Sequence, residues 1–140
     1  MPTVYADTSA IAKLFIAEPE TAELRGWLGG LSELRLVSSA LLPVELLRLL
    51  RLVNSASVHL AEGFLTNDMD IVEITPPILD DATTMPPPRL RTLDAIHLAT
   101  ALDLGGSVSV LLSYDKVLLE AARAAGLAVV CPGAARSTSR

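Results

Sequence analysis

The hydrophobic positions along the 140 residues follow two alternating patterns. Short runs rich in aliphatic and β-branched residues are typical of strands. Longer segments with apolar residues every three or four positions are typical of helices. The runs predict strands at residues 2–6, 34–37, 70–74, 108–114 and 127–132. Helices are predicted over 9–17, 20–28, 40–52, 54–65, 93–104 and 115–126, with a short helical segment from Pro76 and a proline loop over 85–91. This alternation predicts an α/β fold with a parallel sheet of about five strands, covered by helices on both faces.

Composition narrows the class of protein. With 51% hydrophobic and 4% aromatic residues, the core is expected to be aliphatic. No uncharged apolar run reaches the roughly 18 residues of a membrane span, and the first residues lack the features of a signal peptide. We expect one cytoplasmic domain over 1–134 and a flexible tail over 135–140. The lone Cys131 forms no internal disulfide and is expected to be a small buried residue. The net charge of −5 argues against broad electrostatic binding of nucleic acid, but not against binding through a few arginines and a metal.

Four carboxylates stand next to apolar segments. Asp7 and Asp115 follow predicted strands, and Glu45 and Asp94 lie in the first halves of apolar helices. Each has a simple alternative explanation. Asp7 and Asp115 can cap helices, Asp94 can interact with a helix dipole, and Glu45 can pair with Arg48. In a doubly wound sheet, however, all four can converge at the carboxyl ends of the strands.

Four converging anions need a cation, because like charges repel and raise one another's pKa values. Oxygen ligands are those that Mg²⁺ and Mn²⁺ prefer, so the cluster predicts a hydrated Mg²⁺ or Mn²⁺ site suited to phosphoryl chemistry. The chain has no HExxH motif or cysteine cluster for zinc, and no glycine-rich nucleotide loop. His97, three residues after Asp94, either points toward the site or is hydrogen-bonded within the fold, whereas His59 is expected to be exposed. Thr8 or Ser9 is expected to cap the first helix.

Four segments of the chain together resemble the PIN-domain nucleases and, among them, the VapC toxins of bacterial toxin–antitoxin pairs. They are YADTSAIAKLF (5–15), SSALLPVELLRLLR (38–51), LRTLDAIHLATAL (90–102) and LLSYDKVLLEAARAAGL (111–127). The resemblance runs from Met1 to about Gly133. It implies a three-layer α/β/α sandwich and an Mg²⁺-dependent endoribonuclease that hydrolyses RNA. It also implies inhibition by a cognate VapB-like antitoxin, and homodimers.

The resemblance also implies roles for individual residues. Asp7 and Asp94 would bind the metal directly, and Glu45 and Asp115 would hold metal-bound water or a second ion. Smaller polar residues would orient these carboxylates: Thr8, Ser9 and Ser113. Six basic residues are candidates for contacts with the RNA backbone: Lys13, Arg48, Arg51, Arg89, Arg91 and Lys116. The antitoxin would lay a helix over apolar grooves lined by leucines around 46–52 and 60–65.

Two other functions compete with the nuclease hypothesis. The first is a degenerate PIN-like module that binds RNA or protein without cutting, against which the complete acidic positions argue. The second is an Mg²⁺-dependent phosphatase. Such enzymes often carry DxD after the first strand, whereas here Asp7-Thr8-Ser9 lacks the second carboxylate.

Overall fold

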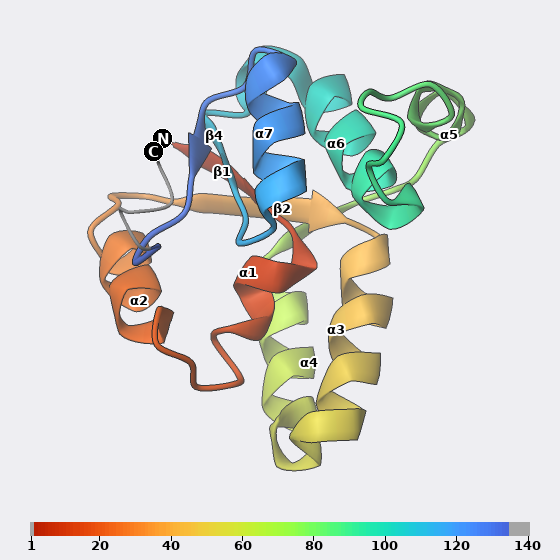
Figure 1. Cartoon of the computed structure of the whole chain (residues 1–140). Coiled ribbons are helices and arrows are strands. Elements are labelled where there is room, and N and C mark those ends of the chain that lie inside the picture. Colours follow the sequence, from red (N-terminus) through yellow and green to blue (C-terminus); the bar gives the residue numbers. More distant parts are fainter. Residues whose placement is uncertain (1, 135–140) are drawn as a thin grey trace.

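The sheet of the computed structural model, which describes residues 2–134, is built from five parallel strands (Figure 1). They are β1 (Thr3–Ala6), β2 (Arg35–Ser39), β3 (Asp70–Val72), β4 (Val110–Leu112) and β5 (Val129–Val130), in the order β3-β2-β1-β4-β5. The helices are α1 (Thr8–Ala12), α2 (Thr21–Gly29), α3 (Leu41–Val53), α4 (Val58–Asn67), α5 (Pro76–Ala82), α6 (Thr92–Leu104) and α7 (Lys116–Ala124). Two 3₁₀ turns, η1 (Ser55–Ser57) and η2 (Gly105–Ser107), follow α3 and α6. The predicted parallel sheet is confirmed, and the predicted tail lies outside the described residues.

Each face of the sheet has its own hydrophobic core. Successive side chains of a strand point to opposite faces. In β1, Val4 and Ala6 therefore pack with α1 to α4, whereas Tyr5 packs with α6 and α7. Leu112 and Leu111 of β4 divide in the same way. Helices α1 to α4 lie on one side of the sheet and α5 to α7 on the other (Figure 1), which confirms the three-layer sandwich.

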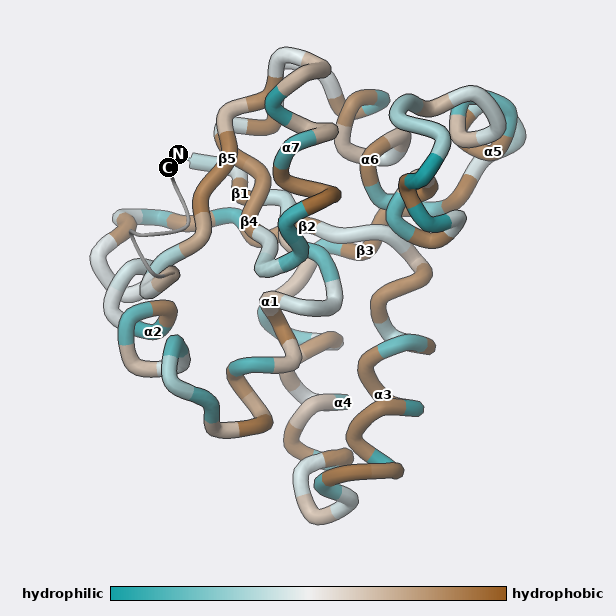
Figure 2. The backbone as a smooth tube through the Cα atoms, in the orientation of Figure 1, coloured by the Kyte–Doolittle hydropathy of each residue, from teal (hydrophilic) through white to brown (hydrophobic). Residues whose placement is uncertain are grey.

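Helices α3 and α4 lie side by side and extend away from the sheet (Figure 1). The buried residues of α3 are Leu42, Leu46 and Leu50, spaced by four positions, as expected for one face of a helix. Apolar residues nevertheless occur all along α3, so much of its length is brown in Figure 2. Its outer face exposes Val44 and Leu52 to 60% and 83%. This hairpin therefore presents apolar surface to its surroundings.

Several predicted boundaries were wrong. The strands predicted over 70–74, 108–114 and 127–132 are shorter in the structure, and the helix predicted to reach residue 17 ends at Ala12. Val108 and Tyr114, outside β4, and Leu127, before β5, still pack against the cores, and the hydrophobic pattern does not distinguish such residues from strand residues. The predicted cap Ser38-Ser39 of α3 is part of β2, although the Ser39 hydroxyl accepts a hydrogen bond from the Leu41 amide at 3.1 Å.

The longest described helices, α3 and α6, have 13 residues each. Within residues 2–134, no helix combines the length and apolar character needed to cross a bilayer.

Candidate active site

A cavity of about 320 Å³ opens next to the carboxyl ends of β1 and β4. The four carboxylates singled out from the sequence all line it, each from a different part of the fold: Asp7 after β1, Glu45 on α3, Asp94 on α6 and Asp115 before α7. The cavity also contacts Thr8, Ser9, Arg91, Thr92, Leu93 and His97. We call this cavity the acidic pocket.

Asp7 is held by hydrogen bonds although it is almost fully buried, at 3% exposure. Its Oδ1 accepts from the Ser9 hydroxyl at 2.7 Å and from the Ala10 amide at 3.2 Å, and its Oδ2 accepts from the Ser113 hydroxyl at 2.7 Å. Asp7 is thus the cap of α1, and the prediction that Thr8 or Ser9 caps this helix was wrong. Both residues already belong to α1, whereas Asp7 has the extended backbone of a capping residue.

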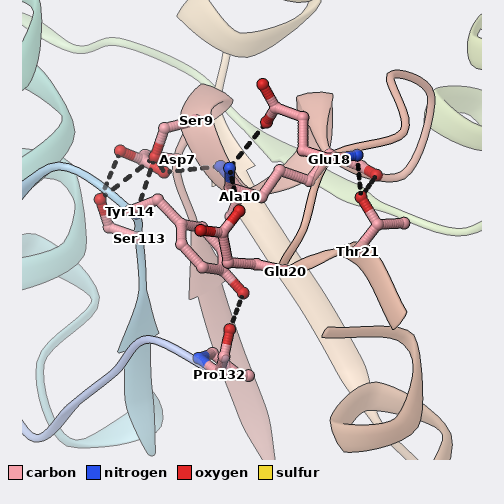
Figure 3. A network of polar contacts seen from close by, with 10 residues as sticks. Asp7, Ser9, Ala10, Glu18, Glu20, Thr21, Ser113, Tyr114 and Pro132 are labelled. Atoms are coloured by element: carbon pink, nitrogen blue, oxygen red, sulfur yellow. Dashed lines mark hydrogen bonds and ion pairs between the residues drawn. The ribbon is translucent and has the colours of Figure 1, made fainter. Parts of the chain in front are cut away.

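The two serine hydroxyls also tie Asp7 to the loop after β4 (Figure 3). Ser9 Oγ accepts a hydrogen bond from the Tyr114 amide at 2.9 Å, and Ser113 Oγ accepts one from the Asp115 amide at 3.0 Å. Each hydroxyl therefore donates to Asp7 and accepts from the loop. Burial raises the pKa of Asp7, and the hydrogen bonds of Ser9 and Ser113 offset part of that rise.

Glu45 is anchored through a single carboxylate oxygen. Its Oε1 accepts from Thr8 Oγ1 at 2.6 Å and lies 2.9 Å from His97 Nε2. Burial acts to raise the pKa of Glu45, but the hydrogen bonds from His97 and Thr8 outweigh it and hold that pKa below its usual value. The alternative in which Glu45 pairs with Arg48 is wrong, because α3 turns Glu45 toward α1 and α6.

Asp94 and Asp115 have a different environment. Asp115 caps α7 by accepting the Leu118 amide at 3.0 Å. Asp94, in contrast, has the Asp115 carboxyl as its side-chain partner, and within residues 2–134 no hydroxyl, amide or cationic side chain donates to it. Burial, followed by the negative charges of Asp115 and Asp7, raises the pKa of Asp94 to about 6. The helix-end explanations for Asp94 and Asp115 are therefore compatible with their place in the pocket, since both also line it.

Comparisons with known proteins show the family to which this chain belongs. The sequence model of the PIN domain matches residues 4–124. The chain belongs to the PIN-domain family. It is 44% identical over 135 residues to Ribonuclease VapC35 of Mycobacterium tuberculosis, which covers 95% of this chain and 99% of that relative. It is thus a PIN domain of the VapC type.

Solved structures share the fold of this PIN domain. VapC20 of Mycobacterium tuberculosis, described as a sarcin–ricin loop cleaving toxin, superposes with a TM-score of 0.72 over 92% of this chain and 99% of that chain, at 19% identity. A chain of VapBC-1 from nontypeable Haemophilus influenzae superposes with a TM-score of 0.65 over 92% of this chain and 97% of that one, at 18% identity. At these identities the likeness concerns the fold.

The acidic pocket of this PIN domain has the donor chemistry of a hard-cation site. Within residues 2–134, no three His, Cys, Asp or Glu side chains are close enough together to hold a metal ion as they stand. The carboxylates instead line an open cavity, with neighbouring charges that raise the pKa of Asp94. Oxygen donors around an open space fit Mg²⁺ or Mn²⁺, since Mg²⁺ usually keeps several of its waters in proteins.

The six basic residues proposed from the sequence do not share one surface. Arg91 lines the acidic pocket, whereas Arg48 and Arg51 line a separate hollow on α3. Lys13 lies 2.7 Å from Glu18 and 3.1 Å from Glu20, and over the Tyr114 ring. Arg89 contacts Glu120 at 3.4 Å, and Lys116 is exposed at the start of α7. Among these six basic residues, Arg91 is therefore the one that lines the acidic pocket.

One residue at the site was not found from the sequence. Tyr5 lies behind the pocket, and its hydroxyl is 2.8 Å from Nδ1 of His97. His97 thus satisfies both readings made of it, since it is hydrogen-bonded within the fold and also lines the pocket. The signal available was the two-residue spacing of Tyr5 and Asp7, because Asp7 continues the extended backbone of β1 and so lies on the same side of the sheet as Tyr5. His59, as expected, is exposed.

Proposed function

We propose that this protein is a metal-dependent endoribonuclease that hydrolyses RNA phosphodiester bonds in the acidic pocket. The observation that carries the proposal is the convergence of four carboxylates from separate elements on one cavity. The 44% identity to Ribonuclease VapC35 over nearly the whole chain supports RNA as the substrate. Hydrolysis adds one water across a P–O bond and leaves a phosphate monoester and a free hydroxyl.

Asp7 and Asp94 would hold the cation directly, while Glu45 and Asp115 would accept hydrogen bonds from water next to it. Mg²⁺ or Mn²⁺, when bound, supplies positive charge to the phosphate oxygens and makes water more acidic. Glu45 suits a water-orienting role because its hydrogen bonds keep it ionised. Asp7 suits a ligand role because Ser9 and Ser113 fix both of its oxygens in position.

The remaining polar residues would position the carboxylates and the substrate. Thr8, Ser9 and Ser113 hold Glu45 and Asp7 in place through hydrogen bonds of 2.6–2.7 Å. Arg91 is exposed at the mouth of the pocket, where a guanidinium can bind a phosphate through two parallel hydrogen bonds. We therefore assign Arg91 the role of binding the RNA backbone beside the scissile bond.

A VapB-like antitoxin is the proposed protein partner, in keeping with the VapBC-1 complex among the structural neighbours. The leucines predicted to line its groove divide in the structure. Leu46, Leu50 and Leu65 are buried in the core, whereas Leu52 and Leu60 are exposed to 83% and 69%. A hollow that includes Leu14, Phe15, Leu60 and Phe64 runs along α4, and an amphipathic antitoxin helix is proposed to bind there. Leu60→Asp is expected to prevent copurification of the antitoxin, and unchanged copurification would exclude this surface.

A homodimer is also proposed, with the outer face of α3 as the contact surface. Val44 and Leu52 are more than half exposed there, and burying them in a second copy would remove apolar surface from water. Light scattering of the purified chain tests this directly. A Leu52→Lys variant is expected to be monomeric if the face is the interface, and a monomeric wild type would exclude the dimer.

The test of the proposed activity is cleavage of total cellular RNA by purified, antitoxin-free protein, with Mg²⁺ and with a chelator. Asp94→Asn is the test variant. Asp103→Asn, an exposed aspartate on the same helix, is the matched control. Cuts that require both Mg²⁺ and Asp94 are expected, with Asp103→Asn as active as wild type. Cuts that persist in chelator or in Asp94→Asn would contradict the proposal, and folded protein that binds RNA without cutting would favour a binding module.

A further inference from the structure

A buried chain of hydrogen bonds lies behind Glu45. The Tyr5 hydroxyl is 2.8 Å from His97 Nδ1, and His97 Nε2 is 2.9 Å from Glu45 Oε1. The exposed fractions of Tyr5 and His97 are 0% and 1%, and their rings meet edge to face with centroids 5.9 Å apart. These two hydrogen bonds thus connect Tyr5, in the core between the sheet and α6, with a carboxylate in the acidic pocket.

The chemistry of the three groups sets the direction of these hydrogen bonds. An ionised carboxylate can only accept hydrogen bonds, and the pKa of Glu45 is held below its usual value. Nε2 of His97 therefore carries the hydrogen that is donated to Glu45. Burial strongly raises the pKa of Tyr5, so its hydroxyl keeps its proton. That hydroxyl can then donate to Nδ1, which is the free acceptor when the imidazole carries its hydrogen on Nε2.

We propose that Tyr5 and His97 are positioning residues that orient Glu45 in the acidic pocket, with Tyr5 donating to Nδ1 of His97 and Nε2–H of His97 donating to Glu45. The catalytic consequence of this arrangement rests on the nuclease function proposed above. The hydrogen bonds themselves do not, so the two can be tested separately.

The orientation matters because of how the two oxygens of Glu45 are used. Oε1 already accepts from Thr8 and His97, whereas the described residues give Oε2 no hydrogen bond. With Oε1 held on two sides, Oε2 is the oxygen left for water or a cation in the pocket. A glutamate without such anchors would sample several rotamers, and confining it to one of them costs conformational entropy. Groups that hold a carboxylate at a metal site in this way commonly change activity by about 10–100-fold when removed.

Two substitutions of His97 separate positioning from simple packing. The amide nitrogen of glutamine reaches about as far as Nε2, so His97→Gln keeps a donor for Glu45 and loses the link to Tyr5. The shorter asparagine reaches about as far as Nδ1, so His97→Asn keeps a partner for Tyr5 and loses the donor to Glu45. Both substitutions remove the imidazole ring from the same buried position, so both are expected to lower Tm comparably.

Kinetics on an RNA oligonucleotide that spans a mapped cut site then distinguish the roles. His97→Asn is expected to lower kcat by about 10–100-fold with KM unchanged, while His97→Gln retains most of kcat. Tyr5→Phe is expected to lower kcat less than His97→Asn, because the imidazole can still donate from Nε2. Equal losses of kcat in the asparagine and glutamine variants, with equal losses of Tm, would show that His97 is only a packing residue.

Long-range ¹H–¹⁵N NMR of the histidine rings in the wild-type protein gives a readout that does not depend on activity or on any variant folding. It is recorded at about pH 8, where an ordinary imidazole is neutral. The expected result is a protonated Nε2 and an unprotonated Nδ1 for His97, with exposed His59 as the internal reference for an unconstrained ring. A hydrogen on Nδ1 instead would overturn the proposal. If wild type cuts no RNA but His97 shows the Nε2–H form, the nuclease function fails while the hydrogen-bonded arrangement stands.

Discussion

The two sides of the acidic pocket differ in how their charges are stabilised. On one side, Asp7 and Glu45 receive hydrogen bonds from hydroxyls at 2.6–2.7 Å, from an imidazole at 2.9 Å and from a backbone amide at 3.2 Å. On the other side, Asp94 receives none from a described hydroxyl, amide or cationic side chain and faces Asp115 and Asp7, whose charges add to the effect of burial on its pKa. The carboxylates of the first side are held in position without a bound ligand. On the second side, the ionised form of Asp94 is destabilised unless a positive charge is bound nearby. A pocket with one hydrogen-bonded side and one side of mutually repelling carboxylates is suited to bind a cation. The repulsion lowers the stability of the metal-free folded state.

The largest expected effect concerns the ordered side. Asp7→Asn is expected to lower the rate of RNA cleavage by roughly 10²-fold or more, because removing one electrostatic group from an active site commonly costs that much. Asp103→Asn, which removes an exposed carboxylate from α6, is the control and is expected to leave the rate unchanged. Cleavage by Asp7→Asn within a few-fold of wild type would show that Asp7 is only a helix cap.

Stability measurements should separate the two sides by sign. Ser113→Ala removes a donor from buried Asp7 and is expected to lower the free energy of unfolding by about 1–3 kcal/mol. Asp94→Asn removes a repelling charge and is expected to raise Tm at neutral pH without metal, by roughly 2–4 °C for each kcal/mol gained. Thermal unfolding in chelator measures both. A fall in Tm for Asp94→Asn would contradict the unpaired state of that carboxylate.

The pH dependence of stability should reveal the same repulsion with a smaller effect. The pKa of Asp94 is about 6 in the folded chain and near 4 when unfolded, so between these values the folded state binds more protons. Its stabilising contribution is complete below about pH 4 and is lost as pH rises through about 6. Metal-free wild type is therefore expected to gain Tm from pH 7 to pH 5, and Asp94→Asn to gain less. The pKa of Glu45 is lowered, so its opposite contribution is lost only at lower pH. Identical profiles for the two proteins would contradict this assignment.

The smallest expected effect lies outside the pocket, where charges are already paired. Lys13 contacts Glu18 at 2.7 Å, and the side chain of Glu18 is 45% exposed. Glu18→Gln is expected to change the free energy of unfolding by no more than about 0.5 kcal/mol, since exposed ion pairs contribute little. RNA cleavage is expected to stay at the wild-type rate. A large loss of cleavage would place Lys13 or Glu18 in substrate binding and would weaken the special status of the acidic pocket.

Much of this arrangement could be predicted from the sequence. The spacing of hydrophobic residues indicates strands and helices, and the positions of the carboxylates relative to them indicate the site. The alternation of strand and helix patterns predicted the parallel sheet, and carboxylates at strand ends and in apolar helices predicted the four acidic residues of the pocket. Local spacing cannot show which partner a side chain meets across the fold. The hydrogen bond from Ser113 to Asp7 joins residues 106 positions apart, and that between Tyr5 and His97 joins residues 92 apart.

The predicted strand over 108–114 illustrates the limit. Its hydrophobic run includes Tyr114, but β4 ends at Leu112. The Ser113 amide still donates to the Val130 carbonyl at 3.3 Å, while its hydroxyl donates to Asp7 and the Tyr114 hydroxyl donates to the Pro132 carbonyl at 2.6 Å. The hydrophobic pattern indicates that these residues are at least partly buried. It does not show that the Ser113 hydroxyl holds Asp7 or that Tyr114 lies beyond the strand.

Calorimetric titration of the metal-free protein with Mg²⁺ or Mn²⁺ tests the central claim most directly, because it measures the cation without requiring the correct RNA. We expect saturable binding by wild type and by Asp103→Asn, and much weaker binding by Asp94→Asn. Absence of binding to the folded wild-type protein, or equal binding by Asp94→Asn, would contradict the account of the acidic pocket as a cation site.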